Sequence, residues 1–515
     1  MTFSFGKDHL TAGKALAILS GKLKTKMETS TKAKIVKCHK QILEIANGSN
    51  VVYGINTGFG PLCNSIISKD KTAELQRNLL ISHAVGVGQP IVPELSKLML
   101  ILKVHALSKG FSGISMKILN RILWHIKNDI IPVVPEQGSV GASGDLAPLS
   151  HLFLPLIGEG KVYVNGKIQS TKTILKKHNK KALTLPPKTG LALINGTQFI
   201  AAHAVMVVEK LGSCLSQADL ISGMMIEGLL GSASPFRSDL HSLRSYKGNC
   251  HVAKRLSGLL KGSKILASHK NCDRVQDPYS LRCIPQVHGA SRTAWLHLKE
   301  CVEIEINSVT DNPIVFSASD TVSGGNFHGQ PLALPLDYAC LAAAELGNIS
   351  DRRSYLSLEG KIEGVPKLLL KETGLNSGFM IVQYTGAALV SENKGLCFPA
   401  SADSIPTSLG QEDHVSMGSI GGRKALKVCE NLENILAVEL ICAAQAFDFH
   451  RPLRSSKVLE KVHNHIRTKI KYATKDRLFG EDILKAAEII RSQKLIELSK
   501  DKSIKSEYDV LFEEY

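Results

Sequence analysis

Residues 138–149, Gly-Ser-Val-Gly-Ala-Ser-Gly-Asp-Leu-Ala-Pro-Leu, place three glycines within seven positions ahead of an acidic residue and an apolar run. Glycine reaches backbone conformations that other residues avoid, so this segment is typical of a tight loop. Its density of glycine is like that of a phosphate-binding loop, but Asp145 stands where that loop needs lysine after its last glycine. The Gly-x-Ser-x-Gly pentapeptide of serine hydrolases is also missing from it. Phosphate binding and serine hydrolysis are therefore both disfavoured.

A different chemistry is open to the middle of this loop, Ala142, Ser143 and Gly144. In a sharply bent backbone the Gly144 nitrogen can attack the Ala142 carbonyl carbon, because glycine is unhindered and alanine adds little bulk. Loss of one water closes a five-membered ring, and loss of a second removes the Ser143 hydroxyl and leaves an exocyclic methylidene. Such a group is a strong electrophile that would substitute for an external organic cofactor, for which the sequence shows no obvious site.

Three further polar residues stand beside glycines or at the ends of predicted helices. Tyr53 opens a second glycine-rich segment, residues 53–60, as either a packed aromatic ring or a phenol presented to a cleft for acid–base chemistry. His83 lies where a predicted helix gives way to glycines, which suits a structural or a catalytic imidazole. Asn195 stands at the head of a predicted apolar helix, where it either caps the helix or points its amide into a cleft.

The elements that position these residues are predicted to be mainly helical. Aromatic residues make up only 5% of the chain while alanine and leucine are plentiful, which favours helices over strands. Asp145 is predicted to cap a helix that follows the glycine-rich loop. The strongest strand signal, residues 161–168, indicates a β-hairpin with an Asn-Gly type I′ turn. Long helices, apolar over most of their circumference and suited to a bundle, are predicted over residues 200–230, 286–306, 333–355, 380–394 and 423–447.

The bulk composition narrows the class of protein. The chain has 515 residues, 43% of them hydrophobic and 21% charged, which is normal for a folded globular protein. Its net charge of +17 is mostly dispersed; the one clear basic cluster, residues 172–181, is interpreted as a solvated surface, with weak polyanion binding as the alternative. The eleven cysteines are widely spaced without a Cys-x-x-Cys pair, which argues against disulfides and a zinc site. With neither a signal peptide nor a membrane-spanning run visible, we expect a cytoplasmic protein without membrane, nucleic-acid or metal partners.

Nine segments resemble, in the same order, those of the ammonia-lyases and aminomutases that carry a methylidene-imidazolone (MIO) group, most closely the members acting on histidine. They are residues 53–60, 82–86, 138–149, 195–198, 276–282, 310–313, 324–329, 374–380 and 411–414. One such match would be weak evidence, whereas nine over almost the whole chain are specific. The resemblance implies a mainly α fold, a long helical bundle of the ammonia-lyase/fumarase type with a small N-terminal catalytic portion and a minor β-hairpin. We expect that portion to span residues 1–200, the central bundle 201–475 and a C-terminal helical cover 476–515, in one integrated catalytic unit.

The resemblance also implies how the reaction centre is made. The MIO electrophile would form from Ala142, Ser143 and Gly144, without a metal or an external organic cofactor. Tyr53 would remove the β-proton of the substrate, and Phe327 would pack against the electrophile.

Four residues would contact the substrate carboxylate or its surroundings. Arg282 would hold the carboxylate in a forked, bidentate manner that lysine does not match. Asn195 and Tyr279 would hydrogen-bond the carboxylate or the ring carbonyl, and Gln276 would be a second hydrogen-bonding neighbour.

His83 and Glu412 bear on the choice of substrate. An imidazole and a carboxylate are partners for a substrate imidazole, whereas a phenyl ring would leave both unpaired in a closed site. The resemblance therefore favours histidine over tyrosine, and both over phenylalanine. Each residue also has a structural interpretation, His83 as a helix cap and Glu412 as an anchor for its own loop.

The reaction implied by the resemblance is the non-oxidative elimination of ammonia from L-histidine to give trans-urocanate, the first step of histidine degradation. The implied assembly is a homotetramer in which each site draws residues from more than one subunit. A tyrosine ammonia-lyase or an MIO aminomutase is the alternative within the class. Outside it stand an inactive helical scaffold, which the intact reactive loop, Tyr53 and Arg282 disfavour, and a polyanion-binding protein, which the dispersed cations disfavour. His288 and His450 depart from the family pattern, which bears only on local packing.

Overall fold

The computed structural model describes residues 2–48, 51–58, 60, 67–269 and 274–515, so Phe59 of the second glycine-rich segment lies outside the described residues. The chain folds into two compact units, each built from three stretches of sequence. The first unit comprises Met1–Met206, Leu298–Asp337 and Pro399–Arg423. The second unit comprises Val207–His297, Tyr338–Phe398 and Lys424–Tyr515. Both units are discontinuous in sequence, whereas the boundaries predicted near residues 200 and 475 follow the chain.

The first unit contains the shorter helices of the N-terminal half. They are α1 (Ala12–Leu19), α2 (Thr29–Asn47), α3 (Thr72–His83), α4 (Pro93–Leu107), α5 (Met116–Lys127), α6 (Leu146–Phe153), α7 (Thr171–Lys177) and α8 (Thr189–Ile194). Short 3-10 helices lie at Lys69–Lys71, Leu154–Ile157 and Ser408–Gly410. Two helix starts follow directly from the sequence. Thr11 caps α1 by accepting a hydrogen bond from Lys14 N–H, and Pro93 opens α4, where its missing N–H leaves no helical bond unmade.

All described strands belong to the first unit. Strand β1 (Thr2–Ser4) pairs in parallel with β2 (Lys24–Lys26), and β3 (Val87–Pro90) pairs antiparallel with β5 (Pro135–Gln137). A three-stranded antiparallel sheet has the order β4 (Ile131–Pro132), β6 (Lys161–Val164) and β7 (Lys167–Ser170), while β8 (Ile314–Ser317) pairs with β9 (Asp320–Val322). The β6–β7 pair confirms the predicted hairpin. Its turn residues Asn165 and Gly166 have φ values of 51° and 73°, as a type I′ turn requires.

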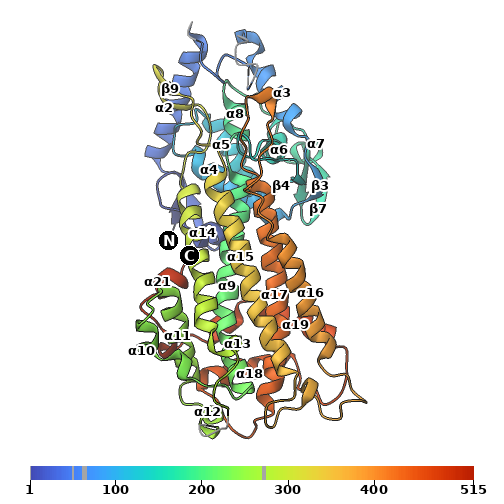
Figure 1. Cartoon of the computed structure of the whole chain (residues 1–515). Coiled ribbons are helices and arrows are strands. Elements are labelled where there is room, and N and C mark those ends of the chain that lie inside the picture. The colour runs from blue at the N-terminus through green and yellow to red at the C-terminus, as the bar shows by residue number, and fades with distance from the viewer. Residues whose placement is uncertain (1, 49–50, 59, 61–66, 270–273) are drawn as a thin grey trace. The chain divides into compact units, whose positions relative to one another are not determined.

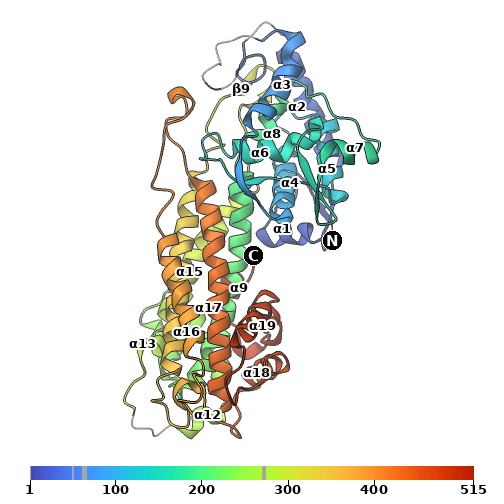
Figure 2. The same cartoon turned by 90° about the vertical axis from the view of Figure 1, so that its right-hand side faces the viewer.

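Four long helices contribute residues to both units. They are α9 (Gln198–Gly228), α14 (Ile284–Glu305), α15 (Gln330–Ser357) and α17 (Gly418–Asp448). Together with α16 (Met380–Leu396) they confirm the five predicted long helices to within a few residues, and with them the mainly α fold class. Within the second unit, α16 and the parts of α9, α15 and α17 that belong to it run roughly parallel (Figure 1 and Figure 2).

Shorter helices complete the second unit. They are α10 (Ser238–Ser242), α11 (Lys247–Leu260), α12 (Lys264–Ser268), α13 (Tyr279–Arg282), α18 (Lys457–Lys469), α19 (Phe479–Arg491), α20 (Lys494–Leu498) and α21 (Asp509–Phe512). Its 3-10 helices lie at Ser234–Phe236, Lys367–Leu369 and Lys502–Ile504.

By length and composition alone, helix α9 could cross a membrane. This differs from the expectation that the chain contains no run of membrane-spanning length. Helix α9 is the only helix of the described residues that passes this test. In the most apolar 18-residue stretch of α9, 83% is buried inside the structure. We therefore interpret α9 as the core helix of a bundle.

Candidate active site

The glycine-rich loop lies between β5 and α6 and bends sharply. Its glycines at positions 138, 141 and 144 all have positive φ, between 69° and 122°. A Cβ at Gly144 would lie 2.2 Å from the Gly196 carbonyl oxygen, and one at Gly141 would lie 2.2 Å from Ser416 Oγ. Both positions therefore exclude a side chain on steric and conformational grounds.

The segment that leads into α17 supports the loop. Met417 N–H donates to the Val140 carbonyl oxygen at 2.9 Å, and the Ser419 hydroxyl donates to the Ser139 carbonyl oxygen at 2.6 Å. Ala142 packs with Met417 in a small apolar cluster. The loop that carries the reactive triplet is thus supported on one side by a distant segment, since Ser419 lies 280 residues after Ser139 in the sequence.

Asp145 has a different role from the predicted one. It precedes α6, but its side chain makes no capping bond to that helix. Instead, Asp145 Oδ2 accepts hydrogen bonds from the N–H groups of Phe199 (2.9 Å) and Ile200 (3.0 Å), in the first turn of α9. Burial raises the pKa of Asp145 to about 7, although these hydrogen bonds oppose the shift. The predicted cap was assigned to the wrong helix: Asp145 caps α9 and so ties the loop to it.

Asn195 lies in a break between two helices rather than at the head of one. Helix α8 ends at Ile194 and α9 begins at Gln198, so the predicted apolar helix is interrupted. Asn195 Nδ2 donates to the Ser143 carbonyl oxygen at 2.8 Å. Asn195 Oδ1 is buried and has no hydrogen-bond partner among the described residues. A buried amide oxygen without a donor is costly, so this atom is a candidate acceptor for a bound molecule.

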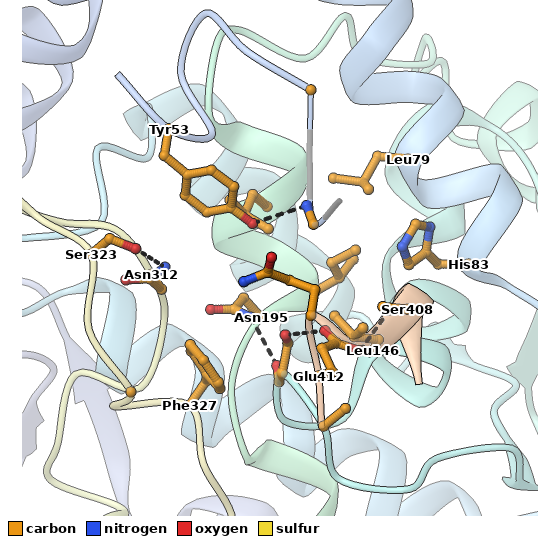
Figure 3. A pocket seen from close by; sticks show the side chains of 18 of the residues that line it. Tyr53, Leu79, His83, Leu146, Asn195, Asn312, Ser323, Phe327, Ser408 and Glu412 are labelled. Atoms are coloured by element: carbon orange, nitrogen blue, oxygen red, sulfur yellow. Dashed lines mark hydrogen bonds between the residues drawn. The ribbon is translucent and has the colours of Figure 1, made fainter. Parts of the chain in front are cut away.

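The loop forms part of the wall of a cavity of about 870 Å³ in the first unit. In Figure 3, Tyr53 and Phe327 lie on one side of this cavity and His83 on the other, with Asn195 and Glu412 between them. The structure thus brings together, as lining residues, the predicted Tyr53, His83, Ala142, Ser143, Asn195, Phe327 and Glu412. The predicted Gly144 lies in the same loop.

Glu412 contacts the reactive loop directly. Its Oε1 accepts a hydrogen bond from the Ser143 hydroxyl at 2.5 Å. Its Oε2 accepts hydrogen bonds from the hydroxyls of Ser408 (2.8 Å) and Thr407 (3.2 Å). Glu412 therefore anchors its own loop and faces Ser143 at the same time, so the two interpretations made from the sequence do not exclude each other.

Tyr53 points its ring into the cavity (Figure 3), and its phenol oxygen accepts a hydrogen bond from Gly60 N–H at 3.2 Å. A backbone donor at this oxygen stabilises negative charge on it. Phe327, on the same side of the cavity, follows a turn that Asn312 stabilises. Asn312 Nδ2 donates to Ser323 Oγ at 3.0 Å, and Asn312 Oδ1 accepts from Gly324 N–H at 2.8 Å.

His83 is the last residue of α3, and its own helix occupies one side of the ring. His83 Nδ1 lies 3.0 Å from Ser82 Oγ, and that hydroxyl donates to the Leu79 carbonyl oxygen at 3.4 Å. The Leu79 carbonyl also forms a hydrogen bond with His83. Because the Ser82 hydroxyl gives its one proton to the Leu79 carbonyl, its oxygen accepts from His83 Nδ1–H, which assigns the proton to Nδ1 and leaves Nε2 as an acceptor. Burial lowers the pKa of His83 and favours this neutral ring.

The remaining predicted residues, Gln276, Tyr279 and Arg282, belong to the second unit. Gln276 and Arg282 line a cavity of about 380 Å³ there, and none of the three lines the larger cavity. Arg282 Nε donates to the Asp277 carbonyl oxygen at 3.1 Å, and its guanidinium lies 4.5 Å from the centroid of the Tyr279 ring. Tyr279 is 70% exposed, so a carboxylate can reach this pair from outside the unit.

Sequence reasoning missed residues that support the site. Lys103 of α4 is fully buried and donates from Nζ to the Asn195 carbonyl oxygen at 2.6 Å and to Gln198 Oε1 at 3.3 Å. Burial lowers the pKa of Lys103 to about 7. The signal was a single lysine within the apolar run 98–107, where a cation needs polar partners. Thr407 and Ser408, which hold Glu412, carried no comparable signal.

The described residues offer no group of three or more His, Cys, Asp or Glu side chains that could hold a metal ion. No cysteine among them forms a disulfide bond. The functional groups that line the larger cavity are instead the Tyr53 phenol, three imidazoles, two carboxylates and several amides, which suit acid–base chemistry and recognition of a polar organic molecule.

Comparison with known proteins decides the family. A family model described as "Aromatic amino acid lyase" matches residues 10–468. The chain belongs to this family. A curated relative from Bos taurus named histidine ammonia-lyase is 44% identical over 498 residues, which cover 96% of this chain and 76% of the relative.

Two solved structures of the aromatic amino acid lyase family have the same fold. Histidine ammonia-lyase from Trypanosoma cruzi is 40% identical, with a TM-score of 0.91 over 99% of this chain and 98% of its own. Tyrosine aminomutase from Streptomyces globisporus is 32% identical, with a TM-score of 0.91 over 97% of this chain and 98% of its own. The family, the fold class and the assignment as a lyase predicted from the sequence are therefore confirmed.

Proposed function

We propose that the chain eliminates ammonia from L-histidine to give trans-urocanate, with an MIO group made from Ala142, Ser143 and Gly144. The observation that carries this proposal is that the reactive loop shares one cavity with Tyr53, His83 and Glu412. The names of the relatives and the near-complete coverage of this chain in both comparisons support the same reaction. It is also the reaction predicted from the sequence.

The loop residues fit the MIO group. Gly144 has a φ of +77° and no room for a side chain, so only the least hindered nitrogen stands at the position that would close the ring. Asn195 Nδ2 already donates to the Ser143 carbonyl oxygen, which would remain as the carbonyl of the ring. Once formed, the group supplies an electrophile that no ordinary side chain provides.

Tyr53 is the proposed base. Its oxygen lies at the cavity wall, and Gly60 N–H stabilises the negative charge that a base needs. The unpaired Asn195 Oδ1 can accept a hydrogen bond from the substrate ammonium or from a protonated neighbour. Phe327 lies on the same side of the cavity as Tyr53, where its ring can pack against the electrophile (Figure 3).

The arrangement of His83 supports histidine as the substrate. With its proton on Nδ1, His83 offers Nε2 as an acceptor, and Glu412 is a second acceptor in the same cavity. A substrate imidazole supplies N–H donors, a phenol supplies one O–H, and a phenyl ring supplies none. Leaving such acceptors unpaired costs about 1–3 kcal/mol each. We therefore rank histidine above tyrosine and tyrosine above phenylalanine, and keep tyrosine ammonia-lyase or aminomutase as the alternative.

The activity test uses the purified protein with L-histidine, L-tyrosine or L-phenylalanine in turn. We expect ultraviolet absorbance of the conjugated acid to rise fastest with histidine and ammonia to appear in equal amount. A rise with tyrosine but none with histidine would contradict the proposed substrate. A β-amino acid detected by nuclear magnetic resonance, without ammonia, would identify an aminomutase instead.

We also propose that Gln276, Tyr279 and Arg282 serve a site completed by another copy of the chain, in a homotetramer. Their place in the second unit and the exposure of Tyr279 support this.

Two single variants test the shared site. Tyr53→Phe should lower kcat by about 10²–10⁴-fold, and Arg282→Ala should raise KM strongly. Refolding the two inactive variants together should restore part of the activity, because some sites then contain both wild-type residues. Mixed tetramers without activity would contradict shared sites.

For the cellular setting we propose the cytoplasm, with no membrane, nucleic-acid or metal partner. The lack of disulfide bonds among the nine described cysteines suits a reducing compartment. Fractionation of cells that express the chain tests this, and activity in a membrane fraction would contradict it.

A further inference from the structure

The contact between Glu412 and Ser143 joins a carboxyl group to the hydroxyl that must depart when the electrophile forms. Ser143 Oγ lies 2.5 Å from Glu412 Oε1, a distance typical of a strong charge-assisted hydrogen bond. Once Ser143 has lost its hydroxyl, this bond no longer exists. The contact therefore belongs to the unprocessed chain and calls for an explanation before substrate binding.

Glu412 is held so that one of its oxygens points at Ser143. The hydroxyls of Ser408 and Thr407 donate to Oε2, the oxygen that does not face Ser143. A backbone hydrogen bond closes the loop between these residues, since Thr407 N–H donates to the Glu412 carbonyl oxygen at 2.9 Å. This arrangement leaves Oε1 for Ser143 alone among the hydrogen bonds that the described residues make to it.

Asn195 prepares the other end of the same residue. Its Nδ2 donates to the Ser143 carbonyl oxygen at 2.8 Å, and its own backbone carbonyl is fastened by Lys103 Nζ at 2.6 Å. A donor on a carbonyl oxygen stabilises the negative charge that develops there when the adjacent Cα loses its proton. Ser143 thus has a charge-stabilising donor at its carbonyl and a proton-transfer group at its hydroxyl.

We propose that Glu412 is the catalytic residue for the dehydration of Ser143, in addition to any contact with the substrate. This inference rests on the proposed MIO group. After Gly144 has closed the ring on Ala142 with loss of the first water, the electrons of the Ser143 Cα–H bond form the Cα=Cβ double bond. The carboxylate of Glu412, which accepts a hydrogen bond from the Ser143 hydroxyl, takes the Cα proton, and the Cβ–Oγ bond breaks with its electron pair on oxygen. Glu412 then gives the same proton to that oxygen, which leaves as water, so that the carboxylate is restored without any other reactant.

The test is the mass of the loop in Glu412→Gln, read from the tryptic peptide that covers residues 128–161 of the purified full-length chain. Glutamine keeps the size and can still accept from the Ser143 hydroxyl, but it cannot exchange a proton. In the wild-type chain we expect a peptide two water masses below that of the sequence. In Glu412→Gln we expect the main species to have lost one water only, which corresponds to a closed ring that still carries the Ser143 hydroxyl.

His83→Ala is the matched control, because His83 lines the same cavity and makes no contact with Ser143 in the described structure. It should lose activity yet lose both waters from the loop. Glu412→Ala, with added acetate during synthesis of the chain, gives a second reading: acetate should increase the fraction that has lost both waters, since a small carboxylic acid can occupy the vacated space. A purely structural role of Glu412 would not respond to acetate.

The outcomes separate this inference from the proposed function. If the wild-type loop has lost no water, the MIO proposal itself fails. If the wild type and Glu412→Gln have both lost two waters to the same extent, the MIO group stands and the role of Glu412 in its formation is refuted. A folded Glu412→Gln that has lost neither water also refutes the assigned step, because it places Glu412 before ring closure. Circular dichroism of each variant establishes that it is folded, as we expect for a half-buried residue at a cavity wall.

Discussion

The cavity of the first unit and the charged centre of the second unit both bury polar groups, but they satisfy them differently. In the second unit, Asp219 accepts hydrogen bonds from Arg255 (2.8 Å) and Arg292 (2.6 Å) and lies 2.9 Å from His288 Nδ1. Burial disfavours its charged form, yet Arg292, His288 and Arg255 hold the pKa of Asp219 well below its usual range. Its carboxylate is therefore ionised and fully engaged within the chain.

Glu513, near the C-terminus, extends this centre. Its carboxylate pairs with Arg292 Nη1 at 2.8 Å and His251 Nε2 at 2.9 Å, and accepts from the Ser216 hydroxyl at 2.5 Å. The cavity, by contrast, contains the unpaired Asn195 Oδ1 and an imidazole with a free acceptor face. A buried carboxylate whose charge is paired inside the chain stabilises the fold, whereas an unpaired amide oxygen in the wall of a cavity indicates where another molecule binds.

Ser143→Ala should give the largest effect on the cavity side of this comparison. Without the serine hydroxyl no methylidene can form, so nearly all ammonia-lyase activity should disappear while the melting temperature stays close to that of the wild type. Steady-state kinetics and circular dichroism measure the two quantities. Full activity in this variant would refute the proposed chemistry of the loop.

Asp219→Ala should give the largest effect on the other side. It removes the buried carboxylate that Arg255 and Arg292 share and leaves Glu513 as their remaining counter-charge, which costs about 3–5 kcal/mol of the free energy of unfolding. Denaturant unfolding measures the loss. Asp239→Ala, which removes the exposed partner of Arg237, is the control and should leave the stability unchanged. If Asp219→Ala lowered the activity of the folded enzyme without lowering its stability, the distinction between the two regions would fail.

The same contrast explains how much the sequence could predict. The long helices and the β6–β7 hairpin follow from periodicity and turn chemistry, which are local. The predicted residues that line the cavity of the first unit were found from motifs, because their residue types are chemically distinctive. Asp145 was misassigned since the N–H groups that it caps lie 54 and 55 residues away, at a helix start that only the break at Asn195 reveals. The partners of Asp219 lie 36 to 73 residues away in the sequence, and no motif connects them with it. His288 was therefore interpreted only as a departure from the family pattern.

His83→Leu should change the choice of substrate rather than stability. Its loss removes the acceptor for a substrate N–H, and we expect transition-state binding of histidine to weaken by about 1–3 kcal/mol. The kcat/KM for phenylalanine should rise relative to that for histidine. Ser82→Ala, which keeps the imidazole and removes one of its hydrogen bonds, should produce a smaller change in the same ratio. An unchanged ratio in His83→Leu would show that His83 only ends its helix.

Asp145→Asn should give the smallest effect and the finest comparison of the two regions. Because burial raises the pKa of Asp145 to about 7, the native chain keeps a proton that the unfolded chain releases at about pH 4. The wild-type stability therefore falls as the pH rises from about 4 to about 7 through this group, and asparagine, which does not titrate, removes that slope. Unfolding by urea across this range should show the stability of Asp145→Asn rising relative to the wild type.

The lowered pKa of Asp219 gives a slope of the opposite sign: its ion pairs stabilise the native chain above the ordinary carboxyl pKa, and the contribution is lost as the pH falls. Asp219→Asn should therefore show its greatest loss of stability at neutral pH and a smaller loss in acid. If both asparagine variants shifted stability in the same direction across the range, burial alone would determine the pKa of both aspartates. The ion pairs of Asp219 would then not distinguish its contribution to stability from that of Asp145 beside the reactive loop.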